Sequence, residues 1–286
     1  MTEIETGIIG GSGFYQMEEV KNSRTIGMTT PFGVPSDQVL TGEFGGKPVA
    51  FLARHGRGHR LNPSEVNYRA NLYALKSLGV KRIISITAVG SLRESLAPSD
   101  LVIPDQYVDL TFKREKTYFE NGIVAHVSMA EPTCPDLSGI AFECARDLGL
   151  TVHAGGTYVN MEGPQFSSKA ESQSYRKMGY DIIGMTQAVE AKLARELEMC
   201  FLPLAFVTDY DCWHEEEGPV SVDLVVRTLK QNISNSIALM AAILRRIDKS
   251  NCQCADSLKF AIMTDAKHIT KDARLRLDLM LNKYLS

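Results

Sequence analysis

The chain has 286 residues, of which 44% are hydrophobic and 23% are charged, and its formal net charge is −3. These are ordinary values for a globular protein, and a chain of this length buries roughly three-quarters of its unfolded surface, enough to fold without disulfides or metals. The slightly acidic balance provides no basic field and argues against nucleic acid as a partner. We therefore expect a small polar metabolite as the ligand.

The sequence carries no signal for a membrane or for secretion. It has no run of about 18 apolar residues that could span a bilayer. Its acidic start, at 1–5, lacks the cationic and apolar pattern of a secretory signal, so we expect a cytoplasmic protein with no membrane partner. The six cysteines have neither the spacing of a disulfide framework nor that of a zinc site. Cys252 and Cys254 fit either two free thiols or a redox or stapling pair.

Short apolar runs alternate with helical patterns along the chain. In the first half we expect strands at 8–9 and 49–53, a helix at 64–78 that starts after Pro63 and stops at Gly79, and a buried strand at 80–89. In the second half, Ser168 and Glu171 form a capping box, and Ser221 with Asp223 caps a long helix that runs to about 247. The remaining expected elements are helices at 137–148, 168–179 and 190–198 and strands at 157–161, 181–183 and 201–207.

This alternation predicts a single α/β domain, in which a twisted, mostly parallel or mixed central sheet is flanked by helices. We place the domain at 1–250 and interpret 251–286 as a helical C-terminal extension of the same domain. Binding sites in such sheets form at the carboxyl ends of the strands. The unusual polar residues of this chain cluster at the ends of the predicted strands.

The first predicted strand opens into Gly10-Gly11-Ser12-Gly13. Backbone N–H groups and the Ser12 hydroxyl of such a turn can converge on an anion, although a structural tight turn fits equally well. The spacing of a dinucleotide fingerprint fails because position 16 is Gln, and no Gly-Lys-Ser/Thr follows as in a triphosphate-binding loop.

Two further strand ends supply donors. Arg54 offers a planar fork that suits phosphate, and its neighbour His55 can add another donor, unless both belong to a solvated loop. Thr87 and Ser91 bracket a second small, hydroxylated turn. Because three strand ends offer such groups together, we expect them to hold one phosphate.

Asp209 and Asp211 follow the apolar strand at 201–207, and an extended backbone would project both to the same side. A carboxyl group whose pKa burial raises could give a proton to a departing base nitrogen. A metal pair or a hydrogen-bonded turn would also explain two acids here, but no histidine cluster is spaced to complete a metal site, so we expect no metal. Phe166 could stack on a flat base and Met185 could lie under a sugar, or both could pack in the core.

Seven motifs together resemble the trimeric purine nucleoside phosphorylases, and within them the branch that acts on 5′-methylthioadenosine. The resemblance covers about 7–245. Its motifs are Gly-Gly-Ser-Gly at 10–13, Arg-His-Gly at 54–56, Asn-Tyr-Arg-Ala-Asn at 67–71, Gly-Ser-Leu-Arg at 90–93, Glu-Gly-Pro-Gln-Phe-Ser at 162–167, Met-Thr at 185–186 and Thr-Asp-Tyr-Asp-Cys-Trp at 208–213.

The resemblance implies a role for each matching residue. The pair Asp209 and Asp211 would read adenine and assist its departure. The other positions are those for phosphate (Ser12, Arg54, His55, Thr87, Ala88 and Thr186), for ribose and base (Phe166, Met185, Gly90 and Ile183), and for the 5′-methylthio group (Ser167, Val222, Val226 and, from a neighbouring subunit, His126).

The resemblance further implies a homo-oligomer, a trimer or a dimer of trimers, that needs no cofactor and uses inorganic phosphate as co-substrate. The implied reaction is phosphorolysis of 5′-methylthioadenosine to adenine and 5-methylthioribose 1-phosphate. The alternatives are a broader purine nucleoside phosphorylase acting on adenosine or 6-oxo purine nucleosides, and an inactive nucleoside-binding protein of the same fold. Two departures bear on the base: Gly184 stands where the family usually has asparagine, and Gln165 where it usually has arginine.

Overall fold

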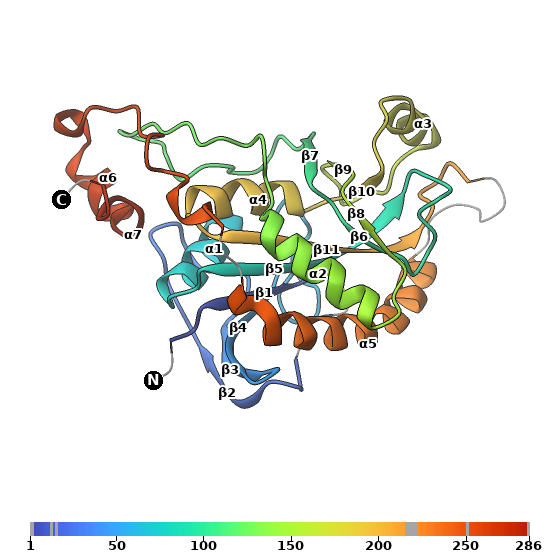
Figure 1. Ribbon diagram of the computed structural model, residues 1–286. Helices are drawn as coiled ribbons and strands as arrows, with labels where there is room; N and C mark the ends of the chain where they lie inside the picture. Colours follow the sequence, from blue (N-terminus) through green and yellow to red (C-terminus); the bar gives the residue numbers. More distant parts are fainter. Residues whose placement is uncertain (1–2, 12–13, 15–16, 215–221, 250–251, 285–286) are drawn as a thin grey trace.

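The computed structural model describes residues 3–11, 14, 17–214, 222–249 and 252–284 (Figure 1). The side chains of 222–227, 229–231 and 249 also lie outside this description.

Within the described residues, eleven strands form one mixed sheet (Figure 1). Along its main path the order is β2-β3-β4-β1-β5-β10-β9-β7, and β11, β6 and β8 branch from β5. The strands are β1 (Thr6–Gly10), β2 (Lys21–Ile26), β3 (Val39–Phe44), β4 (Lys47–Ala53), β5 (Arg82–Ser91), β6 (Leu101–Ile103), β7 (Gln106–Asp109), β8 (Val152–Ala154), β9 (Thr157–Asn160), β10 (Ile182–Gly184) and β11 (Cys200–Asp209).

Strand β5 is the branch point of the sheet. Strand β11 runs parallel to it along one edge, from Arg82 to Gly90. On the other edge, β1 pairs in parallel with 82–85, whereas β10 pairs antiparallel with 90–91. Between these two partners, 86–89 has no strand neighbour on that edge among the described residues. Such a divergence is the place where open α/β sheets bind ligands.

Helices cover both faces of the sheet. On one face α1 (Tyr68–Ser77) contacts α4 (Gln187–Glu196), and on the other α2 (Pro135–Asp147) lies beside α5 (Val222–Arg246), as Figure 1 shows. Neighbouring residues on a strand point to opposite faces. Accordingly, Ile9 belongs to the apolar cluster under α1 and α4, whereas Ile8 belongs to the cluster under α2 and α5. The predicted single α/β domain with a mixed sheet is confirmed.

The helix ends follow local sequence signals. The predicted capping box is present at α3 (Lys169–Lys177), where the Ser168 and Glu171 side chains bond reciprocally to the backbone. The side chain of Asn67 accepts from the Ala70 N–H at the start of α1, so that helix begins later than predicted. The predicted cap at Ser221 lies outside the described residues.

The C-terminal segment is helical and packed. It contains the 3₁₀ helices η2 (Cys254–Asp256) and η3 (Ala266–His268) and the short helices α6 (Lys271–Arg276) and α7 (Asp278–Leu281), and it follows η1 (Ile247–Lys249) at the end of α5. Ala273, Leu277 and Leu281 are buried in the apolar cluster under α1 and α4. Among the described helices, none is both long enough and apolar enough to cross a membrane.

Candidate functional site

A pocket of about 490 Å³ opens at the carboxyl ends of β4, β5 and β11 and after β9 and β10. This volume lies within the range of small-molecule sites. Its lining brings together most of the site residues predicted from the sequence: Arg54, His55, Thr87, Ala88, Gly90, Phe166, Ile183, Met185, Thr186, Asp209 and Asp211.

Arg54 follows β4, and its side chain is 1% exposed. Its guanidinium group donates to both carboxylate oxygens of Glu190, at 2.5 and 3.0 Å, and also to Ser85 Oγ at 2.8 Å and the Ile86 carbonyl at 3.1 Å. Burial lowers the pKa of Arg54, but the Glu190 carboxylate more than offsets this effect and raises it. The fork that we expected to face phosphate is therefore directed at Glu190, and one N–H of Nη1 has no acceptor among the described residues.

His55 differs from the donor expected from the sequence. Its Nδ1 lies 2.9 Å from the Leu61 carbonyl, which can only accept, so Nδ1 carries the proton. Burial, with the positive Arg54 beside it, lowers the pKa of His55 to about 3, so the ring is neutral near pH 7. Its Nε2 is consequently an acceptor. The ring is stacked on that of His59, with centroids 4.4 Å apart.

Thr186 lies at the start of α4, as the residue that precedes its first turn. Its Oγ1 is buried and makes no hydrogen bond within the described part of the chain. A buried hydroxyl without a partner is costly, and a helix N-terminus favours an anion. Together with Thr87, which also lines the pocket, Thr186 therefore marks a subsite suited to phosphate.

Gly11, which follows β1, packs tightly against the same subsite. A Cβ added to Gly11 would lie 2.7 Å from Arg54 Nη1 and 2.8 Å from the Ile86 carbonyl oxygen. Glycine at this position therefore allows the backbone to approach the guanidinium group. Ser12, the predicted phosphate contact in this turn, lies outside the described residues.

The two aspartates reach the pocket by different backbone conformations. The pairing of β11 with β5 shifts between Val207 and Asp209, so Thr208 forms a bulge before the strand ends. Asp211 lies beyond the strand with φ of 52°, a left-handed conformation that aspartate tolerates better than most residues. The extended segment predicted for this pair is wrong, although both carboxylates do line the pocket.

The two carboxylates also differ in their partners. Asp209 Oδ1 accepts the backbone N–H of Asp211 at 2.8 Å, and its Oδ2 accepts the Thr208 hydroxyl at 2.7 Å. Burial raises the pKa of Asp211, and the hydroxyls of Ser172 and Ser167 nearby reduce this effect only in part. Asp209 is thus fixed in place, whereas Asp211 gains from a ligand that donates to it.

Gly90 and Gly184 leave room for side chains that line or support the pocket. A Cβ on Gly90 would lie 3.0 Å from Asp209 Oδ1. A Cβ on Gly184 would lie 2.0 Å from the hydroxyl of Tyr158, which is fully buried. The tyrosine hydroxyl therefore occupies the space that an asparagine side chain at 184 would need.

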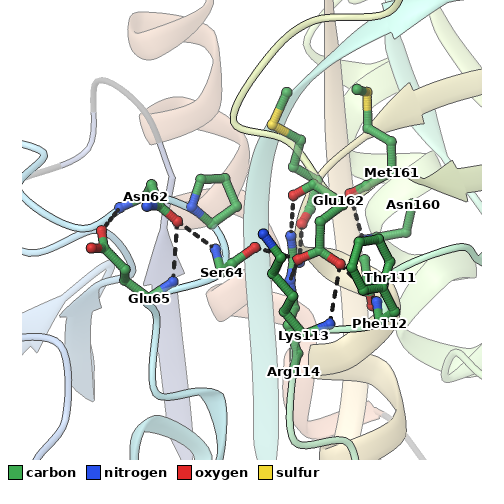
Figure 2. A network of polar contacts seen from close by, with 12 residues as sticks. Asn62, Ser64, Glu65, Thr111, Phe112, Lys113, Arg114, Asn160, Met161 and Glu162 are labelled. Atoms are coloured by element: carbon green, nitrogen blue, oxygen red, sulfur yellow. Dashed lines mark hydrogen bonds and ion pairs between the residues drawn. The ribbon is translucent and has the colours of Figure 1, made fainter.

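A polar network outside the predicted set joins three pocket loops (Figure 2). Arg114 donates to the carbonyl of Met185 and, at 2.6 Å, to the carbonyl of Glu162. The Glu162 carboxylate in turn accepts from the Ser64 hydroxyl and, at 2.6 Å, from the backbone N–H of Phe112. Figure 2 shows these groups converging on Glu162. The network therefore holds the backbone at Met185 and Thr186 in place.

Of the four residues predicted for the 5′-methylthio group, the side chains of Ser167 and His126 are described, and neither is among the residues that line the pocket. Ser167 is buried beside it, and its carbonyl accepts from the Cys212 thiol at 3.2 Å. His126 is exposed and is not among the residues that line the pocket. The side chains of Val222 and Val226 lie outside the description.

Comparisons with known proteins agree with this architecture. A sequence model described as "Phosphorylase superfamily" matches residues 5–245. An S-methyl-5′-thioadenosine phosphorylase of Geobacter sulfurreducens is 52% identical over 281 residues, covering 98% of either chain. A methylthioadenosine phosphorylase from an antarctic soil metagenomic library superposes with a TM-score of 0.92 at 46% identity, over 98% of this chain and 100% of the other.

A more distant solved structure is similar as well. It is a double mutant of the adenosine/methylthioadenosine phosphorylase of Schistosoma mansoni in complex with adenine. It superposes with a TM-score of 0.85 at 34% identity, over 91% of this chain and 100% of the other.

Proposed function

The chain belongs to the phosphorylase superfamily, and we propose that it is an enzyme that cleaves 5′-methylthioadenosine with inorganic phosphate, releasing adenine and 5-methylthioribose 1-phosphate. One observation carries the proposal. The hydroxyl of Thr186, which has no hydrogen-bond partner among the described residues, lines one pocket with the carboxylates of Asp209 and Asp211, so an anion subsite and a base-reading subsite share it.

The spacing along β5 suits a nucleoside. Thr87 marks the anion subsite and Gly90 packs against Asp209, three residues further along the strand. Three residues of a strand span about 10 Å, which is the scale of a ribose with its base. Phe166, Met185 and Ile183 line the same pocket and provide apolar surface for the sugar and the purine ring.

Phosphorolysis needs a phosphate held at the anomeric carbon and a base that is ready to leave. Fixing both reactants in one pocket makes the attack effectively intramolecular, which can lower the barrier by up to about 7–11 kcal/mol. We assign Asp209, in its protonated form, as the general acid that donates a proton to the purine nitrogen gaining negative charge as the glycosidic bond breaks, a transfer that contributes roughly 10²–10⁴-fold. The two hydrogen bonds to Asp209 hold it in position for this role.

Because Nε2 of His55 is an acceptor, the pocket favours one protonation state of the bound phosphate. A neutral imidazole that accepts at Nε2 is matched by a P–OH group rather than by a bare oxygen. We infer that His55 and Thr186 orient a phosphate that carries a proton, while Arg54 contributes positive charge and the remaining Nη1 hydrogen.

The base preference rests on Asp211. An ionised Asp211 accepts a hydrogen bond from the exocyclic amino group of adenine, whereas a 6-oxo purine would present an acceptor there. Gly184 contributes no polar side chain to this contact, so the carboxylate is the main determinant. The S. mansoni relative is described as acting on adenosine as well as methylthioadenosine, and we propose adenosine as a slower second substrate.

The proposal extends to the remaining expectations from the sequence. The reaction as drawn uses no cofactor, because phosphate is the nucleophile. We propose a homo-oligomer, a trimer or a dimer of trimers, in which His126 of one subunit approaches the 5′ end of its neighbour's pocket. The proposed location is the cytoplasm.

Product analysis with 5′-methylthioadenosine, adenosine and inosine, each with and without phosphate, tests the proposal. We expect phosphate-dependent adenine release that is fastest from methylthioadenosine. Faster hypoxanthine release from inosine would favour a 6-oxo purine nucleoside phosphorylase. Binding without turnover in the presence of phosphate would indicate an inactive nucleoside-binding protein.

A further inference from the structure

Four of the six cysteines meet at a place remote from the pocket. The sulfur atoms of Cys134, Cys200, Cys252 and Cys254 all lie within 4.8 Å of one another. None of the four lines the pocket. Cys200 is the first residue of β11 and Asp209 is its last, so the cluster and the carboxylates are separated by nine strand residues, about 30 Å.

Three distant segments build this cluster. Cys134 precedes α2, and its backbone N–H donates to the Phe201 carbonyl at 2.9 Å. Cys200 begins β11, where its N–H donates to the Lys81 carbonyl at 2.9 Å. Cys252 and Cys254 flank Gln253 at the start of the C-terminal segment. The spacing along the sequence, from which we expected no metal, could not reveal a set that only the tertiary fold assembles.

The cluster is dry and its backbone is fixed. Cys134 is 0% exposed, Cys254 5% and Cys200 8%, and these three belong to the apolar cluster under α2 and α5. Cys252 packs against the same cluster. Three of the four thiols are buried and the fourth, Cys252, is partly buried, so the environment is that of a structural centre rather than of an exposed reactive thiol.

The distances between the sulfur atoms fit tetrahedral coordination of one metal ion. Zinc–sulfur bonds are about 2.3 Å long, so the sulfur atoms at the corners of a zinc tetrahedron are about 3.8 Å apart. Cys200 Sγ and Cys252 Sγ are 3.1 Å apart, and no pair exceeds 4.8 Å. Shifts of about 1 Å or less would bring all four sulfur atoms to the corners.

The contacts also favour one shared ion over two disulfides. Cys254 contacts Cys134, Cys200 and Cys252, and Cys200 contacts the other three. Two disulfides would separate the set into two exclusive pairs, each with sulfur atoms about 2.05 Å apart. In the structure each of these thiols instead has several sulfur neighbours.

The surroundings offset the negative charge of such a centre. Four thiolates around Zn²⁺ carry a net charge of −2, and Cys134 stands at the positive N-terminal end of the 13-residue helix α2. The half-buried ammonium group of Lys76 interacts with Cys200. Both features favour thiolates at this position.

We propose that Cys134, Cys200, Cys252 and Cys254 together bind one structural Zn²⁺ ion. Binding replaces the thiol protons, which leave to solvent, and involves no redox change. Four protein ligands fill the coordination shell and leave no position for substrate, so the ion has no part in the proposed reaction. It joins the start of the C-terminal segment to α2 and β11.

Metal analysis of the full-length protein tests this directly. The chain is expressed with zinc in the medium, purified under reducing and metal-free conditions, and assayed by inductively coupled plasma mass spectrometry. We expect one zinc per chain in the wild type and none in Cys252→Ser/Cys254→Ser. Cys144→Ala, which removes a buried cysteine outside the cluster, is the matched control and should retain one zinc.

A second measurement does not depend on the folding of a variant. Apo protein titrated with Co²⁺ should show the visible bands of tetrahedral cobalt thiolate, saturating at one equivalent and lost on addition of zinc. Alkylation without reductant, followed by mass spectrometry, reports the thiol state. Wild-type protein without zinc and without the cobalt spectrum would overturn the proposal, whether the four cysteines prove to be free thiols or disulfides.

Discussion

The buried polar groups at the two ends of strand β11 have opposite kinds of surroundings. At the thiol end, which contains Cys200 and its three partner cysteines, each reactive group contacts others of its kind in a dry core. At the site end, which contains Asp209, the pocket is open and groups such as Thr186 Oγ1 lack a partner within the described part of the chain. The difference shows two kinds of evidence for a ligand: a buried hydroxyl or carboxylate whose hydrogen-bonding capacity is unused, and a group of thiols that converge at the spacing of metal ligands.

The site end also contains groups that are already satisfied, and Glu190 is the most important. Glu190→Gln leaves the buried Arg54 without its carboxylate, so we expect the free energy of unfolding to fall by about 3–5 kcal/mol in urea titrations. Asp248→Asn is the control, because it removes an exposed ion pair with Lys47 and should cost less than about 1 kcal/mol. Equal losses in the two variants would contradict the view that the Arg54–Glu190 pair holds the site end together.

Asp211 tests whether an unsatisfied group at the site end serves a ligand. Asp211→Asn should lower kcat/KM for methylthioadenosine by about 10²-fold and raise the relative rate with inosine. Because burial raises the pKa of Asp211, wild-type kcat/KM should fall as acidification protonates this carboxyl group, and the variant should lose that part of the pH profile. An unchanged ratio of adenine to hypoxanthine release would show that Asp211 does not read the base.

Gly184 tests the packing beneath the site end. Gly184→Ala places a methyl group on the Tyr158 hydroxyl, so we expect a loss of about 2–3 kcal/mol in unfolding free energy. Tyr158→Phe removes the oxygen and should restore part of this loss in the double variant, which a double-mutant cycle measures. Strict additivity of the two effects would mean that the hydroxyl is not the obstacle.

Glu196 lies at the far end of α4, away from Thr186, and gives the smallest expected effect. Burial raises the pKa of Glu196 to about 7, above its usual value in an unfolded chain, so the protonated form is favoured by folding. Stability from this group is complete below about pH 4 and is lost as pH rises towards 7.

Glu196→Gln should remove this dependence. A glutamine can still accept from the Tyr118 N–H and donate to the Thr117 hydroxyl, so both contacts survive. From pH 5 to pH 8 the free energy of unfolding should fall in the wild type by about 1–2 kcal/mol more than in the variant. Urea unfolding at each pH measures this difference. Parallel pH profiles would contradict the raised pKa.

Much of the fold could be predicted from local signals. The cap of α3 and the long apolar runs of β5 and β11 depend only on residues that are close together in the sequence, so they could be predicted, and the structure contains each of them. Strand β2 could not be predicted because it is an exposed edge with no apolar alternation.

The site was predictable where its residues end strands and unpredictable where it depends on pairing. Arg54 could be predicted as a pocket residue from its type and its place after a strand, but its partner Glu190 is 136 residues away, and nothing in the sequence links the two. Arg114 and the cysteine cluster could not be predicted either, because their partners are also distant in the sequence. The donor role expected for His55 failed because the Leu61 carbonyl, a loop contact, decides which ring nitrogen carries the proton.

The position of β5 has a consequence for how the pocket responds to its ligands. Strand β5 is bonded to β11 along one edge and to β1 and β10 along the other, where 86–89 has no partner strand in the part of the chain that the structure describes. A strand held on both edges exchanges its amide hydrogens only when the whole domain opens. The amides at 82–85 therefore belong to the last part of the molecule to admit deuterium, whereas at 86–89, which lines the pocket, only amides that face β11 share this protection.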